Sequence, residues 1–226
     1  MKAAFVIMSR APIAGETKTR LQSHLSPVQC AELHKAFLKD IINKFSVIKK
    51  KYSNLDLYLS ITPPGSENLF EELLNDDFKI IIQRGKDLGK KMYNSLFDAY
   101  NQSNAPVIIT GSDLPSLPIS IITESFAGLK ERDLVIGPSL DGGYYLLGMK
   151  KPHLFLFDQE KWGNESVLEK TLKAASKHEL KSHFLPEWYD VDTFNELLIF
   201  REYLKTTDKE NCDYPLESKK IIDNLL

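Results

Sequence analysis

The sequence has few cysteines and no cysteine or histidine pattern typical of a metal site. Only two cysteines, Cys30 and Cys212, occur among 226 residues, which leaves no basis for a disulfide framework. None of the five histidines has zinc-binding spacing with another histidine or with a cysteine. We therefore expect both cysteines to be ordinary thiols in a reducing cytosol.

Long apolar runs are also missing. None approaches the roughly 20 residues of a transmembrane helix, and the N-terminal run Ala3 to Met8 is too short for the core of a signal peptide. The net charge of -2 gives no sign of a nucleic acid or an anionic membrane as partner. No serine lies in a G-x-S-x-G motif, so a triad hydrolase has no support. By elimination we expect a cytoplasmic protein that binds neither nucleic acid nor membrane.

Apolar strand patterns alternate with helical patterns along most of the chain. The hydrophobic fraction of 42% is enough for a sizeable core. The alternation predicts an α/β fold of three layers, α/β/α, with a mostly parallel sheet. Because no internal repeat or domain boundary is visible, we expect a single domain over residues 1–226 with a C-terminal extension from about residue 207.

The stretch from Gly137 to Met149, G-P-S-L-D-G-G-Y-Y-L-L-G-M, joins two apolar runs. It predicts a strand, a tight turn and a second strand. Gly142 and Gly143 allow positive φ angles and leave room for a ligand, and Asp141 directly precedes them. An ordinary hairpin turn with a solvated Asp141 explains the same letters, since D-G is a common hairpin signal.

Two basic loops follow predicted strands. The first follows Ala3 to Met8, and its marked residues are Arg10, Pro12, Gly15, Lys18 and Arg20. The second follows the strand 79–83; it carries Arg84 and leads into a helix that Asp87 can cap. Basic loops at the carboxyl ends of strands often bind phosphate in α/β sheets. A solvated loop is the structural alternative in both cases, and neither is a Walker P-loop.

Two further acidic residues follow predicted strands. Asp113 comes after the strand 106–110, and Asp192 comes after the last strand and before a helix. Carboxyl ends of parallel strands meet at one edge of a sheet, where ligands bind. Mg²⁺ is usually held there by one or two carboxylates together with substrate phosphates. The structural alternative for Asp113 is a turn. For Asp192 it is a cap of the following helix, a position that either Asp192 or Thr193 can take.

Four motifs occur in a fixed order: R-A-P-I-A-G-E-T-K-T-R-L, G-S-D-L-P, G-P-S-L-D-G-G-Y-Y-L-L-G and D-V-D-T-F-N-E-L. They resemble the glycosyltransferase-like family associated with radical-SAM/selenodomain gene clusters. That family is similar to 2-phospholactate guanylyltransferase and the molybdenum-cofactor nucleotidyltransferases. The resemblance extends from Ala3 to about Leu204 and implies the GT-A nucleotide-diphospho-sugar transferase fold. It is specific for the family and much less specific for a substrate.

The resemblance also implies roles for the matched positions. Asp113 and Asp192 would bind Mg²⁺ or Mn²⁺, and the catalytic residues would be Lys18, Asp113 and Asp141. With the second basic loop included, the expected nucleotide-binding residues are Arg10, Pro12, Gly15, Lys18, Arg20, Arg84 and Asp87. The expected acceptor-binding residues are Asp141, Gly142, Gly143 and Tyr144.

Three functions remain open at this point. The first is a Mg²⁺-dependent nucleotidyltransferase that joins a nucleoside triphosphate to a small acceptor and releases pyrophosphate. The second is a glycosyltransferase with a nucleotide-sugar donor, and the third is a nucleotide-binding protein without catalysis. The fourth-strand motif has a single aspartate, Asp113, in place of the D-x-D common in metal-dependent glycosyltransferases, which favours nucleotidyl transfer. Arg10 also departs from the family pattern, which commonly has lysine there.

Overall fold

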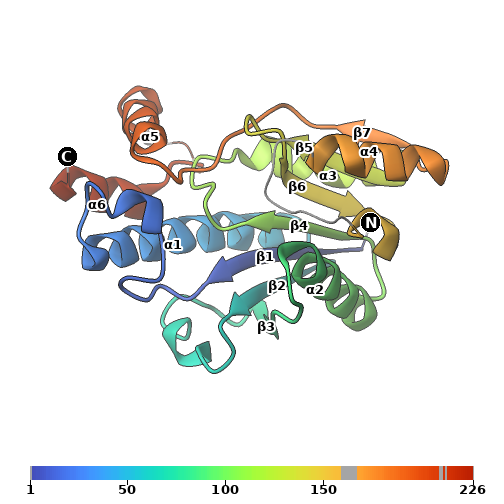
Figure 1. Cartoon of the computed structure of the whole chain (residues 1–226), viewed down its shortest axis with the longest axis horizontal. Helices are drawn as coiled ribbons and strands as arrows, with labels where there is room; N and C mark the ends of the chain where they lie inside the picture. Colours follow the sequence, from blue (N-terminus) through green and yellow to red (C-terminus); the bar gives the residue numbers. More distant parts are fainter. Residues whose placement is uncertain (1, 159–166, 209–210, 212, 226) are drawn as a thin grey trace.

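The computed structural model describes residues 2–158, 167–208, 211 and 213–225. Their strands form a seven-stranded sheet in the order β3-β2-β1-β4-β6-β5-β7 (Figure 1). The strands are β1 (Ala3–Arg10), β2 (Leu55–Thr62), β3 (Phe78–Ile82), β4 (Val107–Gly111), β5 (Leu134–Pro138), β6 (Tyr144–Met149) and β7 (Ser182–Phe184). The helices are α1 (Pro27–Lys51), α2 (Leu88–Ser103), α3 (Ile119–Glu131), α4 (Val167–Lys177), α5 (Phe194–Thr206) and α6 (Leu216–Leu225).

Most strands of the sheet are parallel, as the sequence predicts. Neighbours among β3, β2, β1 and β4 pair in parallel, and so do β5 and β7. Strand β6 is the exception, because it pairs antiparallel with both β4 and β5. The predicted strand, turn and strand around Asp141 are therefore the β5–β6 hairpin, inserted into an otherwise parallel sheet.

Helices cover both faces of this sheet, and the alternation of side chains along β1 shows how. Phe5 and Ile7 pack in one apolar cluster with residues of α1 and α3. Ala4 and Val6 point to the other face and pack with residues of α2 and α4. Successive side chains of a strand point to opposite faces, so a fully apolar strand requires helices on both. This explains the three layers.

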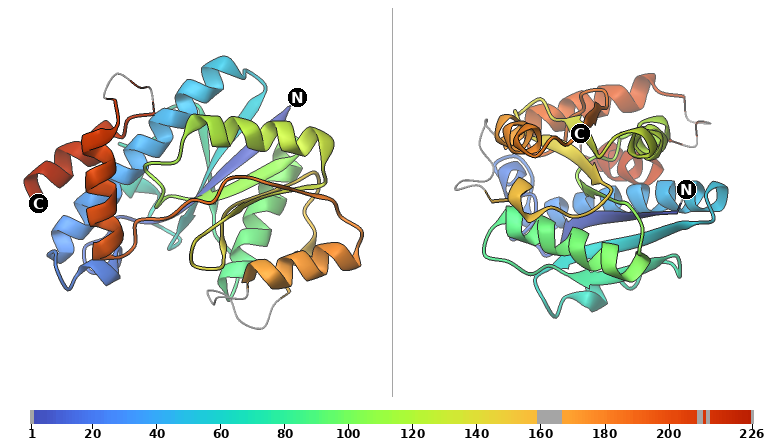
Figure 2. Two further views of the ribbon diagram at one scale, coloured as in Figure 1. Left: turned by 90° about the horizontal axis from the view of Figure 1, so that it is seen from above. Right: turned by 90° about the vertical axis from the view of Figure 1, so that its right-hand side faces the viewer.

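Helices α5 and α6 form an additional group beside α1. Phe37 of α1, Phe200 of α5 and Ile222 of α6 belong to one apolar cluster, and Figure 2 shows the two C-terminal helices against one end of α1. The buried Asp40 of α1 accepts hydrogen bonds from the backbone N–H groups of Glu217 (3.0 Å) and Ser218 (2.7 Å) at the start of α6. The C-terminal segment is thus attached to α1 by apolar packing and by a buried carboxylate.

The N-terminus of α1 has a capping box. The Ser26 side chain accepts a hydrogen bond from Gln29 N, and the Gln29 side chain accepts one from Ser26 N. No helix in the described part of the chain is long and apolar enough to cross a membrane.

Candidate active site

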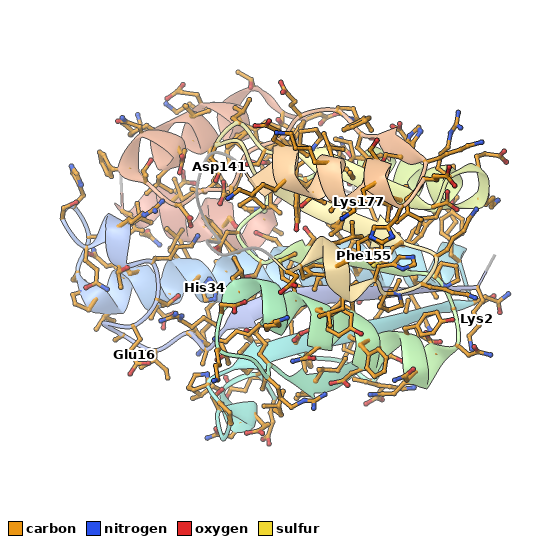
Figure 3. All side chains as sticks on the ribbon, turned by 45° about the vertical axis from the view of Figure 1, so that its right-hand side comes forward. Lys2, Glu16, His34, Asp141, Phe155 and Lys177 are labelled. Atoms are coloured by element: carbon orange, nitrogen blue, oxygen red, sulfur yellow. The ribbon has the colours of Figure 1, made fainter. Side chains whose placement is uncertain are left out.

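A cleft of about 800 Å³ lies at the carboxyl ends of the central strands. Its lining includes Arg10 at the end of β1, Gln83 just after β3 and Gly111 at the end of β4. In Figure 3, Glu16, His34 and Asp141 lie toward this end of the molecule, whereas Lys2, which precedes β1, lies at the opposite end. The cleft thus occupies the edge of the sheet at which α/β proteins bind ligands.

Two aspartates from distant parts of the sequence meet in this cleft around one lysine. The Lys18 Nζ atom lies 2.8 Å from Asp113 Oδ1 and 3.1 Å from Asp192 Oδ1. The Lys18 side chain is 2% exposed, and the two carboxylates are about one-third exposed, at 32% and 35%. Lys18 is therefore a buried counter-ion, and both carboxylates reach the open space of the cleft.

The local backbone directs Lys18 toward the carboxylates. Lys18 has φ 49° and ψ 41°, a left-handed conformation that is uncommon for residues other than glycine. Its ammonium also donates a hydrogen bond to the carbonyl oxygen of Val191 (2.7 Å) and lies 5.2 Å from the centre of the Phe37 ring. Strained backbone conformations concentrate at functional sites, and here the strain accompanies a buried ion pair.

Backbone contacts bring the segment around Asp192 to Asp113. Trp188 pairs in parallel with Ser139 beyond the end of β5, and Val191 N donates a hydrogen bond to Asp113 O (2.9 Å). Thr193 is the N-cap of α5, with its side chain accepting from Glu196 N. The structural alternative for Asp192, a helix cap, is therefore excluded, and its carboxylate is available to face Lys18.

His34 of α1 contacts both β1 and the loop after β4. Its Nε2 atom lies 2.9 Å from the carbonyl oxygen of Arg10 and 3.1 Å from Ser9 Oγ. Its Nδ1 atom lies 3.4 Å from Asp113 Oδ1. The ring is buried, so His34 supports the Asp113 carboxylate from α1.

The charges of the cleft shift the pKa values of its carboxyl groups in opposite directions. Burial would raise the pKa of Asp113, but the Lys18 ammonium and His34 hold that pKa below its usual range. Burial, together with the carboxylates of Asp192, Asp113 and Asp141, raises the pKa of Asp190 to about 7. For Lys18, burial opposes the charge, but the two aspartates keep its pKa above the ordinary value. The lysine therefore stays charged beside the ionised carboxylate of Asp113.

Most of the residues predicted from the sequence line this cleft. They are Arg10, Lys18, Arg20, Asp87, Asp113, Asp141, Gly143, Tyr144 and Asp192. Asp87 also has its structural role, because its side chain accepts a hydrogen bond from Lys90 N (2.7 Å) and caps α2. Lys18, for which we predict contact with the nucleotide, lines the cleft and directs its ammonium at two carboxylates and a carbonyl oxygen.

Four predicted residues do not line the cleft. They are Pro12, Gly15, Arg84 and Gly142. Arg84 NH2 lies 2.6 Å from each carboxylate oxygen of Asp98, so its guanidinium is engaged on the surface of α2. Gly142 has φ 85° and provides the turn of the β5–β6 hairpin. Asp141 Oδ1 accepts a hydrogen bond from Gly143 N (3.0 Å). Asp141 therefore stabilises the hairpin turn, and it also lines the cleft.

Among the other residues that line the cleft, His34, Gln83 and Asp190 were not predicted as site residues from the sequence. Asp190 stands two positions before Asp192, so the D-V-D-T segment could have drawn attention to it. Gln83 directly precedes the basic loop that the sequence did single out. His34 had no signal, because it lies within the apolar pattern of α1 and acquires its partners only from the tertiary fold.

The oxygen donors of Asp113 and Asp192 suit a magnesium ion, which prefers hard oxygen ligands. Each uses one oxygen, Oδ1, for Lys18. Among the described residues, no group of three or more His, Cys, Asp or Glu side chains could hold a metal ion by itself. An ion here would need further oxygens from water or from a substrate phosphate, which is the usual arrangement for Mg²⁺.

A family model matches residues 48–164, about half of the chain; its description is "Uncharacterized protein conserved in bacteria (DUF2064)". The chain belongs to this family. The matched segment includes Asp113 and Asp141, whereas Lys18 and Asp192 lie outside it. No curated protein matches the chain.

Solved structures share the fold over nearly the whole chain. A protein from Desulfovibrio desulfuricans G20 assigned to the nucleotide-diphospho-sugar transferases is 26% identical, with a TM-score of 0.85 over 99% of this chain and 98% of that one. The 4-diphosphocytidyl-2C-methyl-D-erythritol synthase from Anaerococcus prevotii is 12% identical, with a TM-score of 0.60 over 90% and 96%. A cytidylyltransferase from Leptospira borgpetersenii is 11% identical, with a TM-score of 0.54 over 99% and 94%. The expected nucleotide-diphospho-sugar transferase type of fold is confirmed.

Proposed function

We propose that the protein is a nucleotidyltransferase that uses Mg²⁺ to join a nucleoside triphosphate to a small acceptor, with release of pyrophosphate. The observation that carries this proposal is the pair Asp113 and Asp192. The two residues are far apart in the sequence, yet each lies within 3.1 Å of the same Lys18 nitrogen and borders an open cleft. A paired carboxylate site beside basic side chains suits a triphosphate and its cation.

The basic side chains of the cleft would bind the triphosphate. Arg10, Arg20, Lys86 and Lys91 line it, and arginine is well suited to two-pronged contacts with phosphate oxygens. These contacts would orient the α-phosphorus toward the acceptor. Fixing two reactants in this way lowers the entropic part of the barrier.

Asp113 and Asp192 would hold the ion, which when bound would offset phosphate charge and stabilise the transition state. Lys18 and His34 would keep the two carboxylates in place. The acceptor oxygen would form a bond to the α-phosphorus as the bond to the departing pyrophosphate breaks. Asp141, on the hairpin side of the cleft, is our candidate to receive the acceptor proton.

Sugar transfer from a nucleotide sugar is the second candidate function. The observation that favours it is the likeness, at 26% identity, to a protein assigned to the nucleotide-diphospho-sugar transferases. Both reactions would use the same nucleotide and cation sites, and they differ in the bond that breaks. Nucleotidyl transfer releases pyrophosphate, and sugar transfer releases a nucleoside diphosphate.

A ligand panel followed by product analysis tests the proposal. Thermal unfolding would be measured with and without Mg²⁺ in the presence of nucleoside triphosphates and nucleotide sugars. A ligand at 100 times its Kd stabilises a protein by about 2.7 kcal/mol. We expect Mg²⁺-dependent stabilisation by a triphosphate, and pyrophosphate release once an acceptor is supplied. Stabilisation by nucleotide sugars alone would favour sugar transfer, and no stabilisation by any nucleotide would overturn both functions.

A further inference from the structure

Gln83 has a fixed orientation in the floor of the cleft. It follows β3, is 8% exposed, and its backbone N–H donates to Ile61 O (2.9 Å). Its side-chain nitrogen Nε2 donates to two backbone carbonyls, Ser60 O (2.8 Å) and Ser9 O (3.3 Å). Both neighbours can only accept hydrogen bonds, so the amide nitrogen must face them and the amide oxygen must point elsewhere.

The amide oxygen of Gln83 is thereby presented as an acceptor. Both N–H groups of the side chain are used by the two carbonyls, and Gln83 lines the cleft. Among the described residues, no group donates a hydrogen bond to Oε1. Because Gln83 lines the cleft and its Oε1 has no donor from the described residues, this oxygen is available to a donor from whatever occupies the cleft.

Two apolar side chains that line the same cleft as this acceptor suit the face of a flat ring. Met8 at the end of β1 and Met92 in the first turns of α2 line the same cleft. Methionine sulfur makes favourable contacts with aromatic rings. A ring lying against them would turn its edge, where its polar groups are, toward Gln83.

The location of Gln83 also matches the span of one nucleotide. Its amide contacts β1 and β2, and β1 is the neighbour of β4, which leads to Asp113. Neighbouring strands are about 4.8 Å apart, so one or two strand spacings separate the amide from the strand that leads to the paired carboxylates. A nucleotide with its phosphates at the carboxylates would bring its base to this part of the cleft.

We propose that Gln83 selects the base of the nucleotide by accepting a hydrogen bond from an exocyclic amino group. This inference rests on the proposed nucleotide-binding function and specifies its substrate class. The favoured donors are nucleotides with an amino-bearing base, adenine, cytosine or guanine. A base with a carbonyl at the same position would direct an oxygen at the Gln83 oxygen, which leaves both acceptors unpaired.

Pairs of nucleotides that differ at one amino group test this inference in the wild-type protein. Kd would be measured with Mg²⁺ for CTP against UTP, ATP against ITP, and GTP against ITP. We expect one pair to differ by at least about tenfold in favour of the amino-bearing member, since a site built to hydrogen-bond a group discriminates strongly against an analogue without it. Equal affinity within all three pairs would overturn the inference and leave the nucleotide-binding function standing.

Two variants connect the preference to Gln83. Gln83→Met removes the acceptor at similar size and should abolish the amino preference. Gln102→Met makes the same change at an exposed position of α2 and should keep it. If Gln83→Met does not fold, as judged by circular dichroism, the wild-type pairs still decide the question.

A separate comparison tests the ribose as an alternative source of the donor. The 2′-deoxy and 3′-deoxy forms of the tightest-binding triphosphate would be compared with the parent. A loss confined to these forms, with no amino preference, would mean that Gln83 accepts from a ribose hydroxyl, and this would overturn the base assignment. If no nucleotide binds at all, the proposed function fails and this inference fails with it.

Discussion

The two sides of the cleft carry opposite charge. Every described cationic side chain that lines it comes from the first 91 residues: Arg10, Lys18, Arg20, Lys86 and Lys91. Four of its carboxylates come from the later part of the chain: Asp113, Asp141, Asp190 and Asp192. Glu16 and Asp87 are acidic residues on the basic side, and Asp87 is engaged in capping α2.

The difference between the two sides follows from the topology. The basic side comes from the end of β1 and the loop that follows it, and from the loop after β3 and the start of α2. The acidic side includes the β5–β6 hairpin and the segment before α5. Lys18 connects the two sides, because it comes from the basic loop and forms ion pairs with Asp113 and Asp192. A ligand with several negative charges and an accompanying cation would satisfy both sides. Substitutions on one side should therefore have different effects from substitutions on the other.

Substitution of a carboxylate on the acidic side should have the largest effect, and that effect should be on turnover. Asp113→Asn should lower nucleotidyl transfer by about a hundredfold or more, because lost stabilisation of the transition state by a metal costs several kcal/mol. The rate would be measured as pyrophosphate release. Asp76→Asn, at an exposed loop position, is the matched control, and wild-type turnover of the Asp113 variant would remove this residue from the mechanism.

Substitution of Lys18, which connects the two sides, should lower the stability of the protein. Lys18→Met leaves two carboxylates without their buried partner. Loss of one partner of a buried ion pair costs about 3–5 kcal/mol, and because the carboxylates are about one-third exposed, we expect about 2 kcal/mol here. Urea unfolding measures this, with Lys50→Met on the exposed side of α1 as control. Unchanged stability with weaker triphosphate binding would instead make Lys18 a phosphate ligand.

Substitution of a cation on the basic side should weaken phosphate binding and leave nucleoside binding unchanged. Arg20→Ala should weaken binding of a triphosphate about tenfold, which corresponds to about 1.4 kcal/mol, and should leave binding of the nucleoside unchanged. Isothermal titration calorimetry with both ligands measures this. Arg84→Ala is the control, because Arg84 pairs with Asp98 and does not line the cleft. An equal loss for nucleoside and triphosphate would show that Arg20 shapes the loop.

The smallest expected effect is a pH dependence of stability that comes from Asp190 on the acidic side. Burial and neighbouring carboxylates raise the pKa of Asp190 to about 7, against about 3.9 in an unfolded chain. The folded protein therefore holds this proton more tightly, and the contribution of Asp190 to stability is lost as the pH rises from about 4 to about 7. Asp190→Asn removes this loss, so its Tm relative to wild type should rise by a few degrees over that range. A Tm difference that is constant with pH would contradict the assignment.

The sequence predicted the fold and much of the cleft lining, because both depend on local patterns. Apolar strands such as β1 can only be buried between two helical layers, and residues that follow parallel strands meet at one edge. What the sequence could not predict are contacts formed by tertiary packing. The contacts of Lys18 with Asp113 and Asp192 depend on its left-handed backbone and on the fold that brings Val191 and Asp192 beside it. The orientation of the Gln83 amide depends on two carbonyl groups of β1 and β2.

Some residues had two interpretations that only the structure could separate. Thr193 and Asp192 are adjacent, and either can cap a helix, but the capping box forms at Thr193. Arg84 lies in a basic loop, but its guanidinium pairs with the carboxylate of Asp98 in α2. Charge in a loop shows that a cation is present, and the fold decides where that cation points.

We expect Asp113 and Asp192 to act together on one metal ion, and a double-mutant cycle on metal affinity shows whether they do. The apparent Kd for Mg²⁺ would be measured with a bound triphosphate in the wild type, Asp113→Asn, Asp192→Asn and the double variant. Substitutions of residues that act on one ion are not additive in their effects. We therefore expect either substitution to weaken Mg²⁺ binding and the second to add little. Independent effects that sum in the double variant would contradict a shared metal site.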